Sequence, residues 1–236
     1  MKASNSITLW LRWIMANALA EMVGLGLTFL AAVIGFAKLE SLGGLAGILL
    51  GFAFAVATGI FEATLVGWAQ WWAMQPWFPG VRKRDWWRAT VIGALLAYIL
   101  GYLPSTMMSL QTETTQTAAT VEPAQSMLLL LAAGMGLVGG AVLSFAQWLV
   151  LRKHVHGAGI WLPANMLAWM LGMPLIFWAI DQAQILGSNS QAVLLMAGTL
   201  LVVGAIVGAV HGLALVRLTN KNILKRWIAS DEEKPN

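Results

Sequence analysis

The chain of 236 residues contains no cysteine and only 10% charged residues. Without cysteine there is no disulfide framework, thiolate metal site, cysteine nucleophile or S-acylation anchor. Soluble domains carry about a quarter charged residues, whereas 59% of this chain is hydrophobic, with a mean hydropathy of +0.74. Intrinsic disorder is also excluded, because it needs low hydrophobicity and high charge. The composition therefore indicates a polytopic membrane protein.

Six stretches are long and apolar enough to cross a bilayer as helices, which takes about 20 mostly apolar residues each. They are residues 13–36, 43–70, 88–105, 127–151, 160–180 and 192–217. The sequence thus predicts an all-α, six-helix transmembrane bundle that forms one domain over residues 1–236. The Thr-, Gln- and Glu-rich segment 106–126 is predicted to be a polar external loop, and residues 218–236 a cytoplasmic tail.

The basic residues are distributed very unevenly between the connections. If the N-terminus lies in the cytoplasm, 13 of the 14 Lys and Arg residues fall on the cytoplasmic side and only Lys38 falls outside. The positive-inside rule therefore predicts that both termini are cytoplasmic, in a bacterial inner (plasma) membrane or an internal membrane. The basic residues between Arg82 and Arg88 are interpreted as an anchor near anionic lipid, and no nucleic-acid partner is expected.

Two short patterns recur along the chain. The first, Trp, two variable residues, Ala, and Asn or Thr, opens the odd-numbered stretches at Trp13, Trp86 and Trp161. The second, Ala-Gln-Trp, closes the second and fourth stretches at Gln70 and Gln147. His211 takes the corresponding position in the sixth stretch. Recurrence at a nearly constant spacing predicts three repeated α-hairpins.

The even-numbered stretches also carry small residues at every fourth position. Small-xxx-small ridges allow helix backbones to approach closely inside a membrane. The glycines predicted to have this packing role are Gly47, Gly51, Gly59, Gly67, Gly136, Gly140, Gly204 and Gly208.

Three of these elements also carry a resemblance. They are Trp10-Leu11-Arg12-Trp13 followed by Ala16-Asn17-Ala18-Leu19-Ala20-Glu21, the step from Gly59 to Glu62, and the repeated Ala-Gln-Trp. With them the chain resembles an uncharacterised family of bacterial polytopic integral membrane proteins over most of its length. The resemblance implies the architecture and carries no activity.

Ionisable residues within spans are costly and are functional candidates by default. Glu21 lies eight residues after Trp13, and Glu62 lies nine residues before Trp71 on a helix that runs in the opposite direction. At 1.5 Å per residue, both carboxyls lie about 12 Å from the cytoplasmic interface. Two interpretations remain open: a structural pair with one protonated carboxyl, whose ionisation burial disfavours, or a role in handling a proton, cation or ligand.

Other polar residues are predicted at the same end of the helices. They are Asn17, Thr90, Asn165, Gln70, Gln147 and His211. Such residues either hold helices together through hydrogen bonds or join the two glutamates in a ligand- or ion-binding centre. No metal site is predicted, because His211 has no partner ligands in its own repeat.

Nine of the 13 tryptophans gather at the predicted cytoplasmic face and are interpreted as an interfacial belt, whereas Trp169 and Trp178 lie within the fifth stretch. We expect no enzyme and no cofactor, because no nucleophile–base pair, phosphate loop or metal motif appears. The leading hypothesis is a binding, scaffold or accessory subunit whose partners are the lipid bilayer and a membrane protein. The alternatives are a small channel or ion- or proton-coupled transporter that uses Glu21 and Glu62, and a protein that binds a lipophilic ring-bearing molecule, such as a quinone or pigment, at the Trp-rich face.

Overall fold

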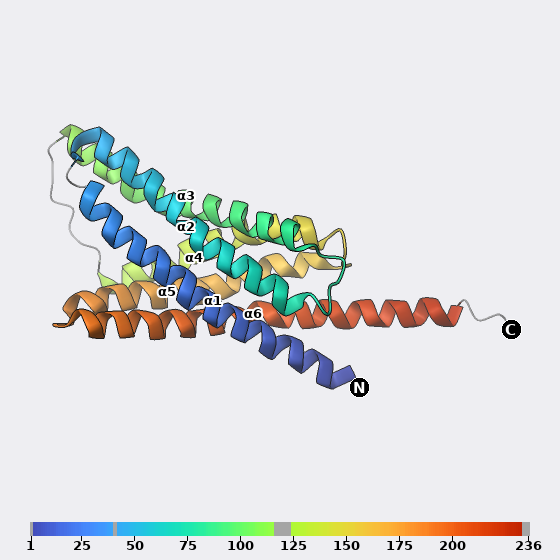
Figure 1. Cartoon of the computed structure of the whole chain (residues 1–236). Coiled ribbons are helices and arrows are strands. Elements are labelled where there is room, and N and C mark those ends of the chain that lie inside the picture. The colour runs from blue at the N-terminus through green and yellow to red at the C-terminus, as the bar shows by residue number, and fades with distance from the viewer. Residues whose placement is uncertain (1, 40–41, 116–123, 233–236) are drawn as a thin grey trace.

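The computed structural model describes residues 2–39, 42–115 and 124–232, and within these residues it is all-helical (Figure 1). The helices are α1 (Lys2–Leu39), α2 (Gly44–Met74), α3 (Lys83–Thr115), α4 (Gln125–Leu151), α5 (Trp161–Ile185) and α6 (Asn189–Glu232), with a short 3₁₀ turn, η2 (Ala158–Ile160), before α5. Six helices of the described chain contain segments long and apolar enough to span a membrane. The protein therefore has the architecture of a multi-pass membrane protein.

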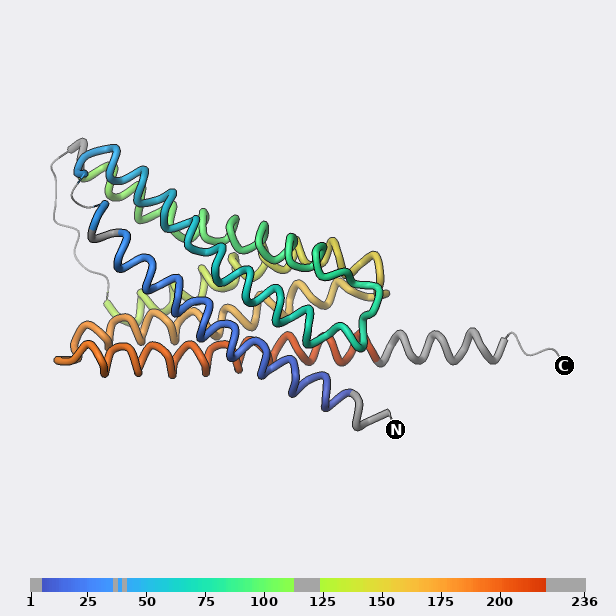
Figure 2. Tube along the Cα trace, viewed as in Figure 1, coloured from blue at the N-terminus to red at the C-terminus, as the bar shows by residue number. Residues whose placement is uncertain are grey.

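The six helices form a closed ring. Each helix packs against the next one along the chain, and α1 packs against α6. The start of α1 and the connections α2–α3 and α4–α5 lie at one end of the bundle, which we call the near end (Figure 2). The ends of α1, α3 and α5 and the starts of α2, α4 and α6 lie at the opposite end, called the far end.

Three helices are much longer than the sequence pattern predicts, and the first of them, α1, already begins at Lys2, ahead of the predicted stretch 13–36. α3 continues to Thr115, into the segment expected to be an external loop, and α6 continues to Glu232, through most of the expected tail. In α3 the hydroxyl groups of Thr106, Ser109 and Thr112 each donate to the carbonyl one turn earlier. Because these hydroxyl groups find hydrogen-bond acceptors on the helix itself, the polar composition of the segment does not end the helix. Residues 116–123, the rest of the expected loop apart from 124–126, lie outside the described residues.

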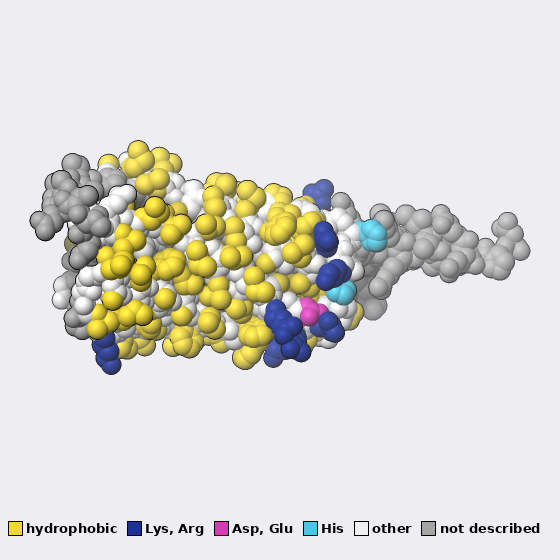
Figure 3. All heavy atoms as spheres, turned by 90° about the horizontal axis from the view of Figure 1, so that it is seen from above, with side chains coloured by type: hydrophobic (Ala, Val, Ile, Leu, Met, Phe, Trp, Pro, Cys, Tyr) yellow, Lys and Arg dark blue, Asp and Glu magenta, His cyan; other side chains and the backbone are white. Residues whose placement is uncertain are grey.

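The surface of the bundle matches a lipid environment. Apolar side chains cover its middle, and Lys and Arg side chains gather at the near-end edge of this apolar belt (Figure 3). An apolar belt flanked by charged side chains is typical of a protein that meets hydrocarbon along its sides and headgroups at its ends.

Close backbone approaches hold neighbouring helices together. A Cβ on Gly204 of α6 would lie 2.7 Å from the Ala18 Cα of α1, and one on Gly140 of α4 would lie 2.7 Å from the Asn165 oxygen of α5. Of the other glycines expected to pack, Gly208 faces α1, Gly136 faces α5, Gly59 and Gly67 face α3, Gly47 faces the end of α1, and Gly51 is buried on α2 beside a far-end cavity. A larger side chain at these approaches would force the helices apart.

Candidate functional site

Three tryptophans at the near end are completely buried and donate across helix interfaces. The Trp13 Nε1–H donates to His211 Nδ1 (2.7 Å), the Trp86 Nε1–H to Gln70 Oε1 (3.2 Å) and the Trp161 Nε1–H to Gln147 Oε1 (3.0 Å). Their rings also meet: Trp161 has edge contacts with Trp13 and with Trp86, each at 5.9 Å between centroids. The same indole-to-acceptor contact therefore occurs between α1 and α6, α3 and α2, and α5 and α4.

The residue four positions after each of these tryptophans ties its side chain back to the same turn. Asn17 Nδ2 donates to the Trp13 oxygen, Thr90 Oγ1 to the Trp86 oxygen and Asn165 Nδ2 to the Trp161 oxygen, at 2.8–3.0 Å. This bond gives the recurring Trp-x-x-Ala-Asn/Thr pattern a physical reason. It fixes the polar side chain one turn away from the indole, facing the centre of the six-helix bundle.

The two glutamines connect these units across the bundle. Gln70 Nε2 donates to Asn17 Oδ1 (2.8 Å), and Gln147 Nε2 donates both to Gln70 Oε1 (3.1 Å) and to Thr90 Oγ1 (3.0 Å). All six helices thus contribute to this near-end network, which we define as the three buried tryptophans with the six polar residues. Its polar members are Asn17, Gln70, Thr90, Gln147, Asn165 and His211, each at most 3% exposed.

The near-end network is closed on itself. Buried amides that bond to each other and to indoles hold a helix bundle together, and a transmembrane hydrogen bond of this kind contributes about 0.6–1.7 kcal/mol. His211 Nδ1 accepts from an indole, so the ring is a neutral acceptor at this nitrogen. This geometry favours the packing interpretation of the six polar residues over that of a ligand site.

The carboxyl groups of Glu21 and Glu62 form a second buried site, between α1 and α2. The two side chains lie beside each other, and the residues are 1% and 7% exposed. An ionised carboxylate only accepts hydrogen bonds, so a bond between two carboxyls requires a proton on one of them. Glu21 Oε2 is buried and has no hydrogen-bond partner. The pair can therefore take up a proton, either between the two carboxyls or on the unpartnered Glu21 oxygen.

Tyr98 of α3, a residue that the sequence analysis missed, completes this site. Its hydroxyl donates to Glu62 Oε2, and its ring packs against Gly59, one turn before Glu62 on α2. Tyr102 follows one turn later, with its ring 5.9 Å from that of Tyr98. A signal was present in the sequence, since the chain has only two tyrosines and both lie in the third apolar stretch, four residues apart.

A cavity opens at the far end of the bundle, between α2 and α3. It has a volume of about 450 Å³, and Tyr102, Ser105, Thr106 and Ser109 of α3 line one side. The glycine-rich start of α2 and Ala55 line the other. Ala55 lies seven residues before Glu62, which is about 10 Å along the helix. Tyr102 lies on the cavity wall, and the hydroxyl of Tyr98, one turn earlier, reaches Glu62. The two tyrosines therefore lie between the cavity and the carboxyl pair.

The carboxyl pair and the near-end network are separate sites. In the part of the chain that the structure describes, no hydrogen bond joins either glutamate to the near-end network. Of the two interpretations left open for the polar residues, the hydrogen bonds of the described residues favour a packing network of amides and indoles, with the carboxyl pair and its tyrosines beside it.

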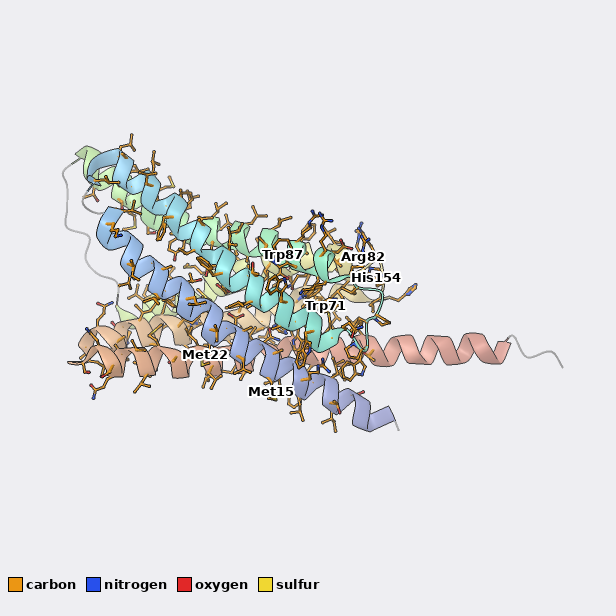
Figure 4. The ribbon with its side chains drawn as sticks, in the orientation of Figure 1. Met15, Met22, Trp71, Arg82, Trp87 and His154 are labelled. Atoms are coloured by element: carbon orange, nitrogen blue, oxygen red, sulfur yellow. The ribbon has the colours of Figure 1, made fainter. Side chains whose placement is uncertain are left out.

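The tryptophans divide into two groups. Trp86 and Trp161, which were interpreted as part of an interfacial belt, are core residues with no exposed surface. Trp71 and Trp87 are only partly buried; their indoles donate to the Val81 oxygen and to Thr64 Oγ1. Figure 4 places both on the near-end half of the bundle, with Arg82 and His154 closer to its tip. The protein itself therefore uses much of the aromatic surface that could have stacked on a ring-bearing ligand.

Comparisons with family models, curated proteins and solved structures found no match to this chain. The resemblance to a family of bacterial integral membrane proteins thus stays a prediction from short motifs. Any function has to be argued from the two sites.

Proposed function

We propose that this multi-pass membrane protein is a proton-responsive binding or accessory protein, in which Glu21 and Glu62 hold an exchangeable proton. The observation that carries the proposal is the buried carboxyl pair contributed by two helices, in which Glu21 Oε2 lacks a hydrogen-bond partner. Burying two carboxyls in a membrane protein is costly, and hydrogen bonds between helices can be made by amides at a lower cost.

The surroundings of the pair suit a proton better than a metal ion. A Cβ on Gly24 would lie 2.8 Å from the Glu62 Cα, and one on Gly204 would lie 2.9 Å from the Glu21 Cβ, so backbones enclose both side chains. Calcium and magnesium require about six or more oxygen ligands. Among the described residues, no three His, Cys, Asp or Glu groups could hold a metal ion together. A proton needs only the two carboxyls and the Tyr98 hydroxyl.

Access to the pair is one-sided in this proposal. Towards the far end, the hydroxyls of Tyr98 and Tyr102 lead to the cavity, and a hydroxyl can both donate and accept a proton. Towards the near end stand Gln70 and Gln147, whose amides do not titrate. His211 is the titratable group of the near-end network, and its Nδ1 accepts from Trp13. A proton would therefore enter and leave through the far end, which favours a proton-responsive protein over a channel.

We further propose three repeated hairpins with the near end in the cytoplasm of a bacterium. The support is that the indole contact recurs on three helix pairs and that basic residues gather at the near end. The far-end cavity would then face the external side, and its pH would set the protonation of the pair. The response would reach lateral partners through α1 and α2, which carry the glutamates.

Infrared spectroscopy of the protein in lipid nanodiscs tests the proposal. The difference spectrum between wild type and the Glu21→Gln/Glu62→Gln variant, which keeps the other eight Asp and Glu residues, should contain a C=O band of a protonated carboxylic acid that is present at low pH and falls as the pH rises. Asp181→Asn is the matched control, because Asp181 is exposed and hydrogen-bonded to Gln125. A difference spectrum without such a band, or with one that does not change with pH, would refute proton exchange at this pair.

The lack of native cysteine allows sidedness to be tested with single cysteines. Ser109→Cys places a thiol in the far-end cavity, and Met15→Cys places one on the exposed side of α1 (Figure 4). Attaching a bulky thiol reagent at position 109 should slow the change of the carboxyl band after a pH jump, and attachment at position 15 should not. Equal rates in both labelled proteins would contradict entry from the far end.

A further inference from the structure

Two tryptophans on α2 present their rings to the outside of the bundle near its basic end. Trp68 and Trp72 are separated by four residues and are therefore neighbours on one helix face. Their exposed fractions are 45% and 55%, in contrast to the fully buried tryptophans of the near-end network. This leaves two adjacent aromatic surfaces at the edge of the apolar belt.

A cationic side chain from a neighbouring helix lies over each of these rings. The Arg12 guanidinium of α1 lies 3.8 Å from the centre of the Trp72 ring, and its Nη2 donates to the Trp72 oxygen at 2.8 Å. The Lys83 Nζ of α3 lies 4.6 Å from the centre of the Trp68 ring. Three helices thus hold two positive charges on one face, each fixed by a cation–π contact.

Neither charge is neutralised by the protein. The ion pair found among the described residues joins Arg82 to Asp85, so no described carboxylate pairs with Arg12 or Lys83. Arg12 Nε is covered and has no hydrogen-bond partner. A partly covered guanidinium without a counter-charge attracts an anion, because its charge is less well hydrated than that of a free side chain.

We propose that Arg12, Lys83, Trp68 and Trp72 form a binding site for the phosphate of an anionic phospholipid. The site combines two exposed aromatic rings with two basic side chains, a combination typical of the depth of lipid headgroups. A guanidinium that lies flat on a ring keeps N–H donors along its edge, where a phosphate can accept two of them. The exposed side chains of Met15 and Phe61, further along α1 and α2, would contact the acyl chains.

Native mass spectrometry of the protein released from nanodiscs measures this site directly. The nanodiscs contain phosphatidylcholine with a minor fraction of phosphatidylglycerol, and the readout is phosphatidylglycerol retained per protein. Wild type should retain phosphatidylglycerol in preference to phosphatidylcholine. Because the phosphate would lose its charge-assisted hydrogen bonds to both side chains, Arg12→Gln/Lys83→Gln should lower the affinity by at least about thirtyfold.

Arg152→Gln is the matched control, because the Arg152 guanidinium lies 4.8 Å from the centre of the Trp148 ring at the same end. Its lipid retention should match that of wild type. Equal losses in the control and the double variant would indicate general charge attraction and overturn the site, as would no preference for phosphatidylglycerol in wild type. Arg12→Lys is a second control, for loss of the fold. It keeps the positive charge but loses the bidentate hydrogen-bond donor, so retention should fall between that of wild type and that of the double variant.

Discussion

The Trp13 indole donates to His211 Nδ1 at 2.7 Å, in the position where Trp86 and Trp161 donate to glutamine oxygens. The histidine in α6 thus accepts an indole N–H, as the glutamines in α2 and α4 do. The Trp13 and His211 rings also meet edge to face, at 5.6 Å between centroids. His211 therefore acts as a hydrogen-bond acceptor and as a packing surface.

This equivalence predicts that His211→Gln preserves the fold, because the amide oxygen can accept the Trp13 indole. His211→Leu should lower the free energy of unfolding by about 1–3 kcal/mol, since the buried Trp13 N–H loses its acceptor. Both variants can be compared by thermal unfolding in the same detergent. If the glutamine variant is as unstable as the leucine variant, the acceptor role is wrong.

Gln147 should be the most sensitive polar position of the near-end network. Its side chain makes three hydrogen bonds, to Gln70, Thr90 and Trp161. At about 0.6–1.7 kcal/mol for each transmembrane bond, Gln147→Leu should cost about 2–5 kcal/mol of stability. Gln125→Leu, at the exposed far end of the same helix, is the control and should change little. Equal melting temperatures for the two variants would show that the near-end network adds no stability.

The spans and the carboxyl pair could be predicted from the sequence, because both follow from counting along helices. Apolar runs set the spans, and the equal depth of Glu21 and Glu62 places them opposite each other on antiparallel helices. The burial of Trp86 and Trp161 could not be predicted in this way. A tryptophan near the end of a span is typical of the membrane interface, and only the closure of the ring, with α1 against α6, covers these side chains.

The far end was the least predictable part. Thr and Ser in segment 106–126 suggested a loop, but hydroxyls that donate to the preceding turn extend α3 to Thr115. That extension places Ser109 on the wall of the far-end cavity. Tyr98 was missed because two tyrosines four residues apart mark one face of a helix but do not show which helix that face meets. The close contact between Gly59 and the Tyr98 ring arises only when α2 and α3 pack together, so the sequence alone does not show it.

The close approach between α6 and α1 predicts a strong dependence on side-chain size. Gly204→Leu would place atoms where the Ala18 Cα and the Asn17 oxygen lie, each 2.7 Å from a Cβ at this position. Overpacking of this kind costs about 1–3 kcal/mol, and it should also disturb Glu21, which contacts the same glycine. Gly198→Leu, on α6 with open space around it, should be tolerated. The check is thermal unfolding of both variants, and a stable Gly204→Leu protein would contradict the packing.

The Tyr98 hydroxyl predicts a kinetic effect that a purely structural role would not produce. Tyr98→Phe removes the donor to Glu62 and keeps the ring that packs on Gly59, so the loss of stability should be about 1 kcal/mol, typical of one hydrogen bond. If Tyr98 passes protons between the cavity and the pair, the carboxyl infrared band of this variant should respond to a pH jump at least about tenfold more slowly. That is the effect expected when a positioned proton-transfer group contributing 10²–10⁴-fold is lost.

Tyr102→Phe should slow the response of the band as well, because Tyr102 lies between the cavity and Tyr98. Thr64→Val removes the hydroxyl that accepts from Trp87, away from this route, and should leave the rate unchanged. Wild-type rates in both tyrosine variants would mean that the proton reaches Glu62 by another path, since the ring packing is retained in each.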